Sequence, residues 1–472
     1  MLACMVGGLG LARVSDAQIA LPDMGDPSQS IISSADEQAI GDAFMRELRA
    51  HVDLVEDPDV VQYVYSLGYE LASHETGPKP NFTFFVVQDG AINAFAAPGG
   101  YIGINSGLIT TTETEGELAS VVAHEIAHVT QRHIARGLEQ QEKMTLPALA
   151  GLAAAILLGM QNPEAGQAAV AAVTAGQAQL MLNFSRIQEQ EADRIGMQML
   201  AGAGFDPRAM PAFFEKLQRA SRYYRQPPEF LSTHPVTVSR IADTRSRADG
   251  YEYRQRPDRL EFYLVRAKLE VMQMDPQEAV RRFEDRLARG QHLSRDATRY
   301  GLALALLEGN QPVRAHELAQ SLNASDPDRV PYIELLARTE VAAGRVARAL
   351  DIYADALELY PGDETLTRGH VQTLLRANEP KKALRAINDY GRHQPLDAVM
   401  YRLSAQAYQQ TGDRRGAHAA QAEHYYLVGK LDAAVQQLKL AIQAPGNGDD
   451  FYESSRIEAR LSELQRERAR RE

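Results

Sequence analysis

A regular spacing of small residues and prolines runs through the second half of this 472-residue chain. An interval of 34 residues separates the successive alanines Ala315, Ala349, Ala383 and Ala417. The same interval, or nearly the same, separates two further sets, Pro327, Pro361 and Pro395, and Gly309, Gly344, Asn378 and Gly412. An alanine lets paired helices approach closely, and a proline ends one unit before the next begins. The spacing therefore predicts a stack of helix pairs.

A 34-residue period with two such markers in phase is the signature of tetratricopeptide repeats. The alternative is an unrelated helical bundle whose alanines are spaced by coincidence. Gly429 and Ala434 follow at half the period, so the array ends irregularly, and Tyr452 to Arg470 is a candidate cap. A chain of this length exceeds one hydrophobic core. We place the domain boundary in a polar link, which gives a first domain at 18–258 and a repeat domain at 259–472.

The charge balance narrows the possible partners. A net charge of −12 argues against nucleic-acid binding, which needs a basic surface, and no polybasic patch suits an anionic membrane. The single cysteine, Cys4, lies in an apolar segment at the N-terminus. Residues 1–17 resemble an export signal cut before Gln18, although the usual basic start is missing. The alternative is an apolar strand of a cytosolic fold. A mature chain without cysteine has no disulfides and no thiol catalysis.

Two apolar stretches in the first domain, 145–160 and 168–182, are shorter than a membrane-spanning helix. We interpret them as buried helices of a soluble core. A hairpin lying against a membrane is the alternative, so peripheral membrane contact stays open.

The first domain is predicted to mix helices and a few strands. Ser34 to Glu37 has the spacing of a capping box and opens one helix, and Asp57-Pro58 opens the next. Strands are expected at 82–87 and on both sides of the turn Pro98-Gly99-Gly100. A long helix follows over 112–136, with acidic residues in its first turns, where the helix dipole favours them.

That long helix contains the sequence His-Glu-x-x-His at residues 124–128. His124 and His128 lie about 40° apart around a helix, so both imidazoles can bind one metal ion. Glu125 stands beside them and can reach a water molecule at the metal. Imidazole ligands with an open position suit zinc. A helix with two histidines of purely structural role is the alternative.

A catalytic zinc needs a third protein ligand, and the helical segment Glu189-Gln190-Glu191-Ala192-Asp193 lies about 60 residues downstream. Together with Asn-Ala-x-Ala-x-Pro-Gly-Gly upstream, these motifs resemble the gluzincin peptidases related to the prenyl-protein protease and to HtpX. Nearly the whole chain, from Leu21-Pro-Asp-Met-Gly25 through Ser232-Thr-His-Pro235 to the repeats, resembles the BepA-like periplasmic branch of that family.

The resemblance implies an α+β, mainly α, zincin-like protease domain followed by an α-solenoid. It implies one Zn²⁺ per chain, with Glu189 and not Glu191 as the third ligand. It also implies a periplasmic endopeptidase for unfolded or misassembled proteins, whose repeat domain contacts the outer-membrane protein assembly machinery or stalled β-barrel substrates.

Other residues near these motifs receive separate expectations. Asp193 shares a helical face with Glu189 and can accept a hydrogen bond from a ligand imidazole, whereas Glu191 points about 160° away and is expected to be a solvated charge. His133 is expected on the face opposite His124 and not to be a ligand. His234 either enters the zinc site, as a fourth ligand or oxyanion donor, or caps the next helix.

Arg240 either pairs with an active-site carboxylate or stabilises the transition-state anion, or is a surface residue. In the expected mechanism, zinc lowers the pKa of a water molecule toward about 7 and Glu125 takes its proton. The strand Tyr101 to Ile104 is predicted to be the sheet edge that pairs with an extended substrate. The competing function is a chaperone or adaptor with a structural or latent zinc site. A third possible function, an interaction scaffold without metal, would require the His-Glu-x-x-His and Glu-x-x-Ala-Asp motifs to coincide by chance.

Overall fold

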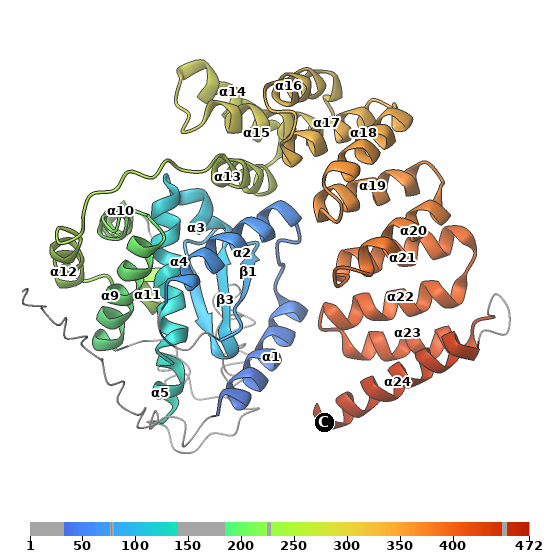
Figure 1. Cartoon of the computed structure of the whole chain (residues 1–472), viewed down its shortest axis with the longest axis horizontal. Coiled ribbons are helices and arrows are strands. Elements are labelled where there is room, and N and C mark those ends of the chain that lie inside the picture. The colour runs from blue at the N-terminus through green and yellow to red at the C-terminus, as the bar shows by residue number, and fades with distance from the viewer. Residues whose placement is uncertain are drawn as a thin grey trace, which may run out of the picture.

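The structure is a computed structural model, and it describes residues 33–75, 77, 80–139, 185–223, 228–445 and 451–471. Figure 1 shows a helical lobe built around a small sheet and a curved array of helix pairs beside it. The fold is mainly α, as predicted. The proposed signal at residues 1–17 and both apolar stretches, 145–160 and 168–182, lie outside the described residues. Among the described helices, none has the length and apolar character needed to cross a membrane.

The lobe with the sheet contains the first elements of the chain. They are α1 (Ser34–His51), α2 (Pro58–Ser73), β1 (Thr83–Val87), β2 (Ala94–Ala97), a 3-10 turn (Pro98–Gly100), β3 (Tyr101–Asn105), α3 (Ser106–Thr111), α4 (Glu115–Thr130), α5 (His133–Glu139), α9 (Arg186–Gly202), α10 (Ala209–Tyr223), α11 (Phe230–Thr233) and α12 (Val238–Ala248). Asp57 caps α2 as predicted. The capping box of α1 is formed by Ser33 and Asp36, one residue earlier than predicted.

The sheet has the strand order β1-β3-β2, with β3 parallel to β1 and antiparallel to β2. The prediction that Tyr101 to Ile104 forms a sheet edge is therefore wrong, because β3 is paired on both sides. Among the described strands, β2 forms one edge of the sheet and pairs only with β3. At the other edge, Leu54 makes an isolated bridge to β1. The close turn between β2 and β3 depends on Gly99 and Gly100, whose φ angles are 77° and 84°.

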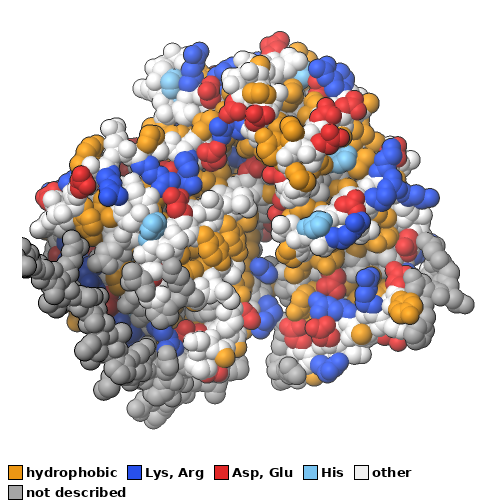
Figure 2. Space-filling model, viewed as in Figure 1, with side chains coloured by type: hydrophobic (Ala, Val, Ile, Leu, Met, Phe, Trp, Pro, Cys, Tyr) orange, Lys and Arg blue, Asp and Glu red, His pale blue; other side chains and the backbone are white. Residues whose placement is uncertain are grey.

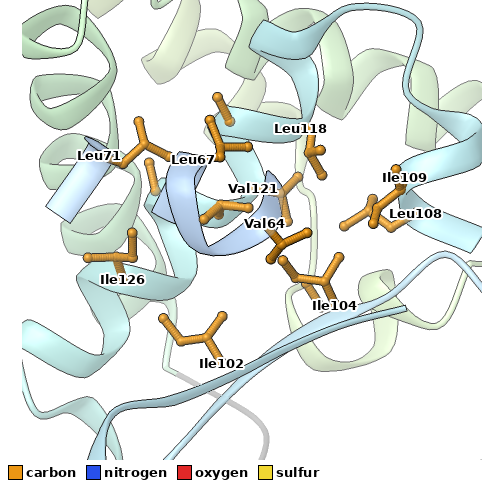
Figure 3. Close-up of a cluster of buried hydrophobic side chains, with 14 of the residues drawn as sticks. Val64, Leu67, Leu71, Ile102, Ile104, Leu108, Ile109, Leu118, Val121 and Ile126 are labelled. Carbon is orange, nitrogen blue, oxygen red and sulfur yellow. The ribbon is translucent and has the colours of Figure 1, made fainter. Parts of the chain in front are cut away.

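Helix α4 lies at the centre of this lobe, and its hydrophobic side chains are buried against neighbouring elements on several sides. Leu118, Val121 and Ile126 pack against α2 and the sheet, as Figure 3 shows. Helix α9 packs closely on α4 at Gly196, where a Cβ atom would lie 3.2 Å from the backbone nitrogen of His124. This close approach brings the start of α9 to the face of α4 that carries His124 and His128.

The second lobe is a solenoid of antiparallel helix pairs. Its helices are α13 (Leu260–Met272), α14 (Pro276–Arg289), α15 (Arg295–Glu308), α16 (Pro312–Ser325), α17 (Val330–Ala342), α18 (Val346–Leu359), α19 (Glu364–Arg376), α20 (Pro380–Gly391), α21 (Ala398–Thr411), α22 (Arg414–Leu427), α23 (Leu431–Gln443) and α24 (Phe451–Arg471). The four periodic alanines are buried on the second helix of successive pairs. The repeat prediction is confirmed.

The solenoid curves back onto the first lobe and contacts it at several points. Helix α13 contributes to the cores of both lobes. The Lys268 ammonium is buried and lies 2.9 Å from both carboxylate oxygens of Asp57 and 2.6 Å from Asp59 Oδ2, and the hydroxyl of Thr365 donates to Asp59. Further along, Gly429 in the α22–α23 turn lies against the backbone of α1. The two lobes thus form one curved body (Figure 1).

Candidate metal centre

His124 and His128 lie one turn apart on α4, and both side chains are buried. Their Nε2 atoms are 3.0 Å apart, so both imidazoles point to the same place. Burial holds the pKa of His128 well below its ordinary value, which leaves the neutral imidazole that a metal requires.

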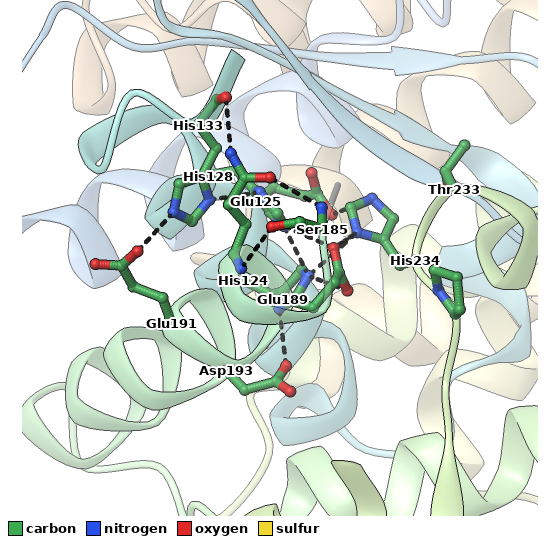
Figure 4. A network of polar contacts seen from close by, with 12 residues as sticks. His124, Glu125, His128, His133, Ser185, Glu189, Glu191, Asp193, Thr233 and His234 are labelled. Carbon is green, nitrogen blue, oxygen red and sulfur yellow. Dashed lines mark hydrogen bonds and ion pairs between the residues drawn. The ribbon is translucent and has the colours of Figure 1, made fainter. Parts of the chain in front are cut away.

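Glu189 and His234 complete the group from α9 and from the end of α11. Glu189 Oε1 lies 3.4 Å from His128 Nε2 and 2.9 Å from His234 Nδ1. One possible ligand atom from each of His124, His128, Glu189 and His234 lies within 4.8 Å of the others (Figure 4). Although burial acts in the opposite direction, the imidazoles around Glu189, His234 foremost, hold its pKa well below the ordinary value, so it is a carboxylate.

This donor set fits a metal ion. Three imidazole nitrogens and one carboxylate oxygen converge in a buried place, and nitrogen with carboxylate oxygen is the ligand mixture of catalytic metal sites. Despite the opposing effect of burial, hydrogen bonds to Asp193 and Glu189 raise the pKa of His124 to about 9. The carboxylates of Asp193 and Glu189 therefore favour the positively charged form of the His124 imidazole.

Glu125 lies at the side of this group, fully buried between α4 and the sheet. Neither oxygen of its carboxylate makes a hydrogen bond of normal geometry, and Oε1 lies 3.5 Å from His234 Nε2. Burial raises the pKa of Glu125, while the neighbouring imidazoles and the backbone of Ala96 on β2 lower it in part. A buried carboxylate with raised pKa and open acceptor positions is suited to exchange protons with a bound molecule.

Asp193 and Arg240 lie behind the possible ligand side chains. Asp193 Oδ1 is 3.0 Å from His124 Nδ1, on the side of the ring that points away from the group. The Arg240 guanidinium holds both oxygens of Asp193, at 2.8 and 2.7 Å, and its Nη1 lies 2.5 Å from Glu189 Oε2. Arg240 is 3 % exposed, so the alternative of a surface arginine is wrong. The guanidinium pairs with two carboxylates of the site.

His234 is also buried, and its ring stacks on Phe230 with ring centroids 4.7 Å apart. It does not cap the following helix, because the N-cap of α12 is Thr237. The structure brings His234 into the group of possible ligands and excludes the alternative of a capping residue.

His133 and Glu191 differ most from the sequence-based expectation. The predicted helix over 112–136 breaks after Thr130, and Arg132 adopts a φ of 51° before α5 begins. The chain therefore turns back, and His133 Nδ1 comes within 2.9 Å of His128 Nδ1 instead of lying on the opposite face. Glu191 is partly exposed, but it is also paired, since its Oε2 lies 3.2 Å from both His133 Nε2 and Arg136 Nη1. Helical geometry alone could not reveal this contact.

A buried helix with His-Glu-x-x-His, a carboxylate from a second helix and an adjacent glutamate together define a metallopeptidase. Comparison with known proteins agrees with this class. The family model described as peptidase family M48 matches residues 59–248, and a tetratricopeptide repeat model matches residues 340–407. The chain belongs to peptidase family M48.

Relatives of similar length carry the name beta-barrel assembly-enhancing protease. The protein from Escherichia coli strain K12 is 36% identical over 98% of this chain and 95% of its own length. The protein from Yersinia pestis is 35% identical over 95% of this chain and 92% of its own. The mitochondrial metalloendopeptidase OMA1 of Arabidopsis thaliana is 34% identical over 32% of this chain and 28% of its own length.

Proposed function

We propose that this metallopeptidase is a zinc-dependent endopeptidase in which His124, His128 and Glu189 hold the metal and Glu125 is the general base. The observation that carries this proposal is the convergence of these ligand atoms beside a buried, unbonded carboxylate. Two or three imidazoles with one carboxylate suit zinc better than magnesium or calcium, which prefer oxygen ligands.

A bound zinc ion supplies a Lewis acid, which polarises the scissile carbonyl and makes water acidic near neutral pH. Glu125 takes the proton from the attacking water and returns it to the leaving amine. Asp193 Oδ1 lies 3.0 Å from His124 Nδ1, so that Nε2 of His124 points into the site. Arg240 holds Asp193 and Glu189 in place through three contacts.

The proposed substrate is an extended, unfolded chain that adds to the outer edge of β2, a buried strand that pairs only with β3 among the described strands. The amide of Asn105 donates to Asn93 O, so these two residues form a hydrogen-bonded pair. In an antiparallel ladder, hydrogen-bonded and non-hydrogen-bonded pairs alternate along the strand. Ala94 and Ala96 therefore direct their backbone groups away from β3, and Ala96 lies beside Glu125. Backbone pairing at this edge would place a peptide bond near the base with little demand on side chains.

The name beta-barrel assembly-enhancing protease of the full-length relatives supports a role in β-barrel assembly, and we propose outer-membrane protein quality control in the periplasm. Unassembled β-barrels expose unpaired strand edges, which suit an edge-strand protease. The repeat domain would contact substrates or the assembly machinery. Between the lobes, a cavity of about 580 Å³ lined by α2, α13 and α19 offers space for a protein segment. Figure 2 shows the molecule hollowed between the lobes, with acidic and basic side chains interspersed around it.

A latent site is the second candidate, and the position of His234 favours it. If His234 is a fourth ligand, the site has no open position for water, and the protein acts mainly as a chaperone or adaptor until this imidazole moves away.

Cleavage of a urea-unfolded β-barrel protein after dilution, compared with the same protein folded in detergent, tests both candidates. We expect the zinc-loaded chain to cleave only the unfolded form, and His234→Ala to cleave it faster if His234 closes the site. No cleavage of either form by either protein would contradict the protease proposal. Equal rates for the wild type and His234→Ala, with equal zinc content, would contradict latency.

A further inference from the structure

The second ligand histidine of α4 has a hydrogen-bonded chain behind it that the proposed mechanism does not use. His128 directs Nε2 to the site, and its Nδ1 lies 2.9 Å from His133 Nδ1. On its other side, His133 Nε2 lies 3.2 Å from Glu191 Oε2 (Figure 4). The first two residues are buried, and the chain ends on a carboxylate that Arg136 also contacts.

The backbone turn between α4 and α5 holds His133 in contact with His128. The turn between α4 and α5 places Arg132 at a φ of 51°, a conformation that costs free energy for a residue with a side chain. Two nitrogens of Arg132 bond to Glu37 Oε1 on α1, at 3.0 and 2.8 Å. Gln188 on α9 donates to the carbonyl of His133 at 3.1 Å. Helices α1 and α9 therefore both fix the turn that carries His133.

The positions of the hydrogen atoms in this series of hydrogen bonds follow from which atoms can donate. A carboxylate only accepts, so the hydrogen of a neutral His133 must lie on Nε2, facing Glu191. His133 Nδ1 then accepts, and His128 Nδ1 must carry the hydrogen. This leaves the lone pair of His128 Nε2 directed at the site, as a metal ligand requires. The opposite tautomer of His128 would place a hydrogen where the metal binds.

We propose that His133 is a positioning residue, which fixes the orientation and tautomer of His128 for metal binding while Glu191 fixes His133 in turn. The inference rests on the proposed function, because it assumes that His128 is a ligand. It gives His128 the same kind of support that Asp193 gives His124.

The test compares the full-length chain, freed of metal with a chelator, with two variants of the same position. His133→Asn keeps an acceptor near the place of Nδ1, whereas His133→Phe fills the space without one. We expect zinc to bind His133→Phe about 10- to 100-fold more weakly than wild type, and His133→Asn within about threefold. Cobalt absorption should show a changed ligand field only in the Phe variant. His316→Phe is a matched control, since His316 bonds Thr339 in the solenoid.

Thermal unfolding of the metal-free variants separates positioning from packing. We expect both His133 variants to unfold at similar temperatures and to differ in zinc affinity. Equal zinc affinity of His133→Phe and wild type, or equal losses in both variants, would overturn the positioning role. A wild-type chain that binds no zinc would overturn the proposed function itself. The zinc affinity of the wild type therefore distinguishes failure of the proposed function from failure of the positioning role.

Discussion

At the scale of residues, each of the two histidines that α4 brings to the proposed metal site is contacted by a different residue on the side of its ring away from the site. His124 contacts Asp193, which Arg240 holds in turn, and His128 contacts His133. The first contact could be predicted in part from the sequence, because Asp193 follows Glu189 by one helical turn. The second could not, because the left-handed turn at Arg132 has no glycine to mark it.

Arg240→Met is expected to destabilise the metal-free protein by about 3–5 kcal/mol, because Asp193 and Glu189 would remain buried without their partner. Urea unfolding in the presence of a chelator measures this change. Arg247 on the same helix is the control. Its pair with Asp243 is exposed, so Arg247→Met should cost less than about 1 kcal/mol. Similar losses for both variants would contradict the buried role of Arg240.

At the scale of elements, periodicity and turn residues predict most helices and strands, but not which strand lies at the edge. Gly99 and Gly100 mark the turn between β2 and β3 in the sequence. The parallel pairing of β1 with β3 joins residues distant from that turn, so no local pattern indicates it. The same limit applies to Glu191, whose partner His133 lies in another helix.

The outer edge of β2, which pairs with no other described strand, predicts how substrate backbones are recognised. In a peptide that is cleaved, N-methylation at alternate residues near the cut site should abolish cleavage, since those amides pair with Ala94 and Ala96. Methylation at the residues between them should change the rate little. Rates from chromatography of the products distinguish the two registers, and equal tolerance of both would argue against edge pairing.

At the scale of the whole molecule, the 34-residue period predicts the solenoid well but not its return onto the first lobe. Lys268 on α13 and Thr365 on α19 meet Asp59 on α2, and only the three-dimensional curvature brings these positions together. Burial opposes both ionised forms, yet the Lys268 ammonium lowers the pKa of Asp59, and Asp59 raises the pKa of Lys268 well above its ordinary value.

Lys268→Met should reduce the free energy of unfolding by about 3–5 kcal/mol at neutral pH, because Asp57 and Asp59 would lose their buried cation. Asp59 has a lowered folded pKa, so its contribution is present above about pH 4 and is lost as the pH falls through the folded value. Lys268 has a raised folded pKa, so its contribution is complete below about pH 10 and is lost as the pH rises through the folded value.

Urea unfolding at several pH values measures this contribution. The exposed pair of Arg289 with Asp285 is the control, and Arg289→Met should change stability by less than about 1 kcal/mol. Equal stability of the wild type and the Lys268→Met variant at pH 7 would refute a stabilising role for the buried contacts of Lys268 with Asp57 and Asp59.

The most direct measurement is cleavage of an unfolded protein such as casein by the zinc-loaded chain and by its Glu125→Gln variant. The proposed mechanism predicts that both proteins bind zinc equally and that only the wild type cleaves, since the amide cannot accept the proton of the attacking water. Equal cleavage by both proteins would contradict the assignment of Glu125 as the base. If both bind zinc and neither cleaves, even after His234→Ala, the site is structural and the endopeptidase proposal fails.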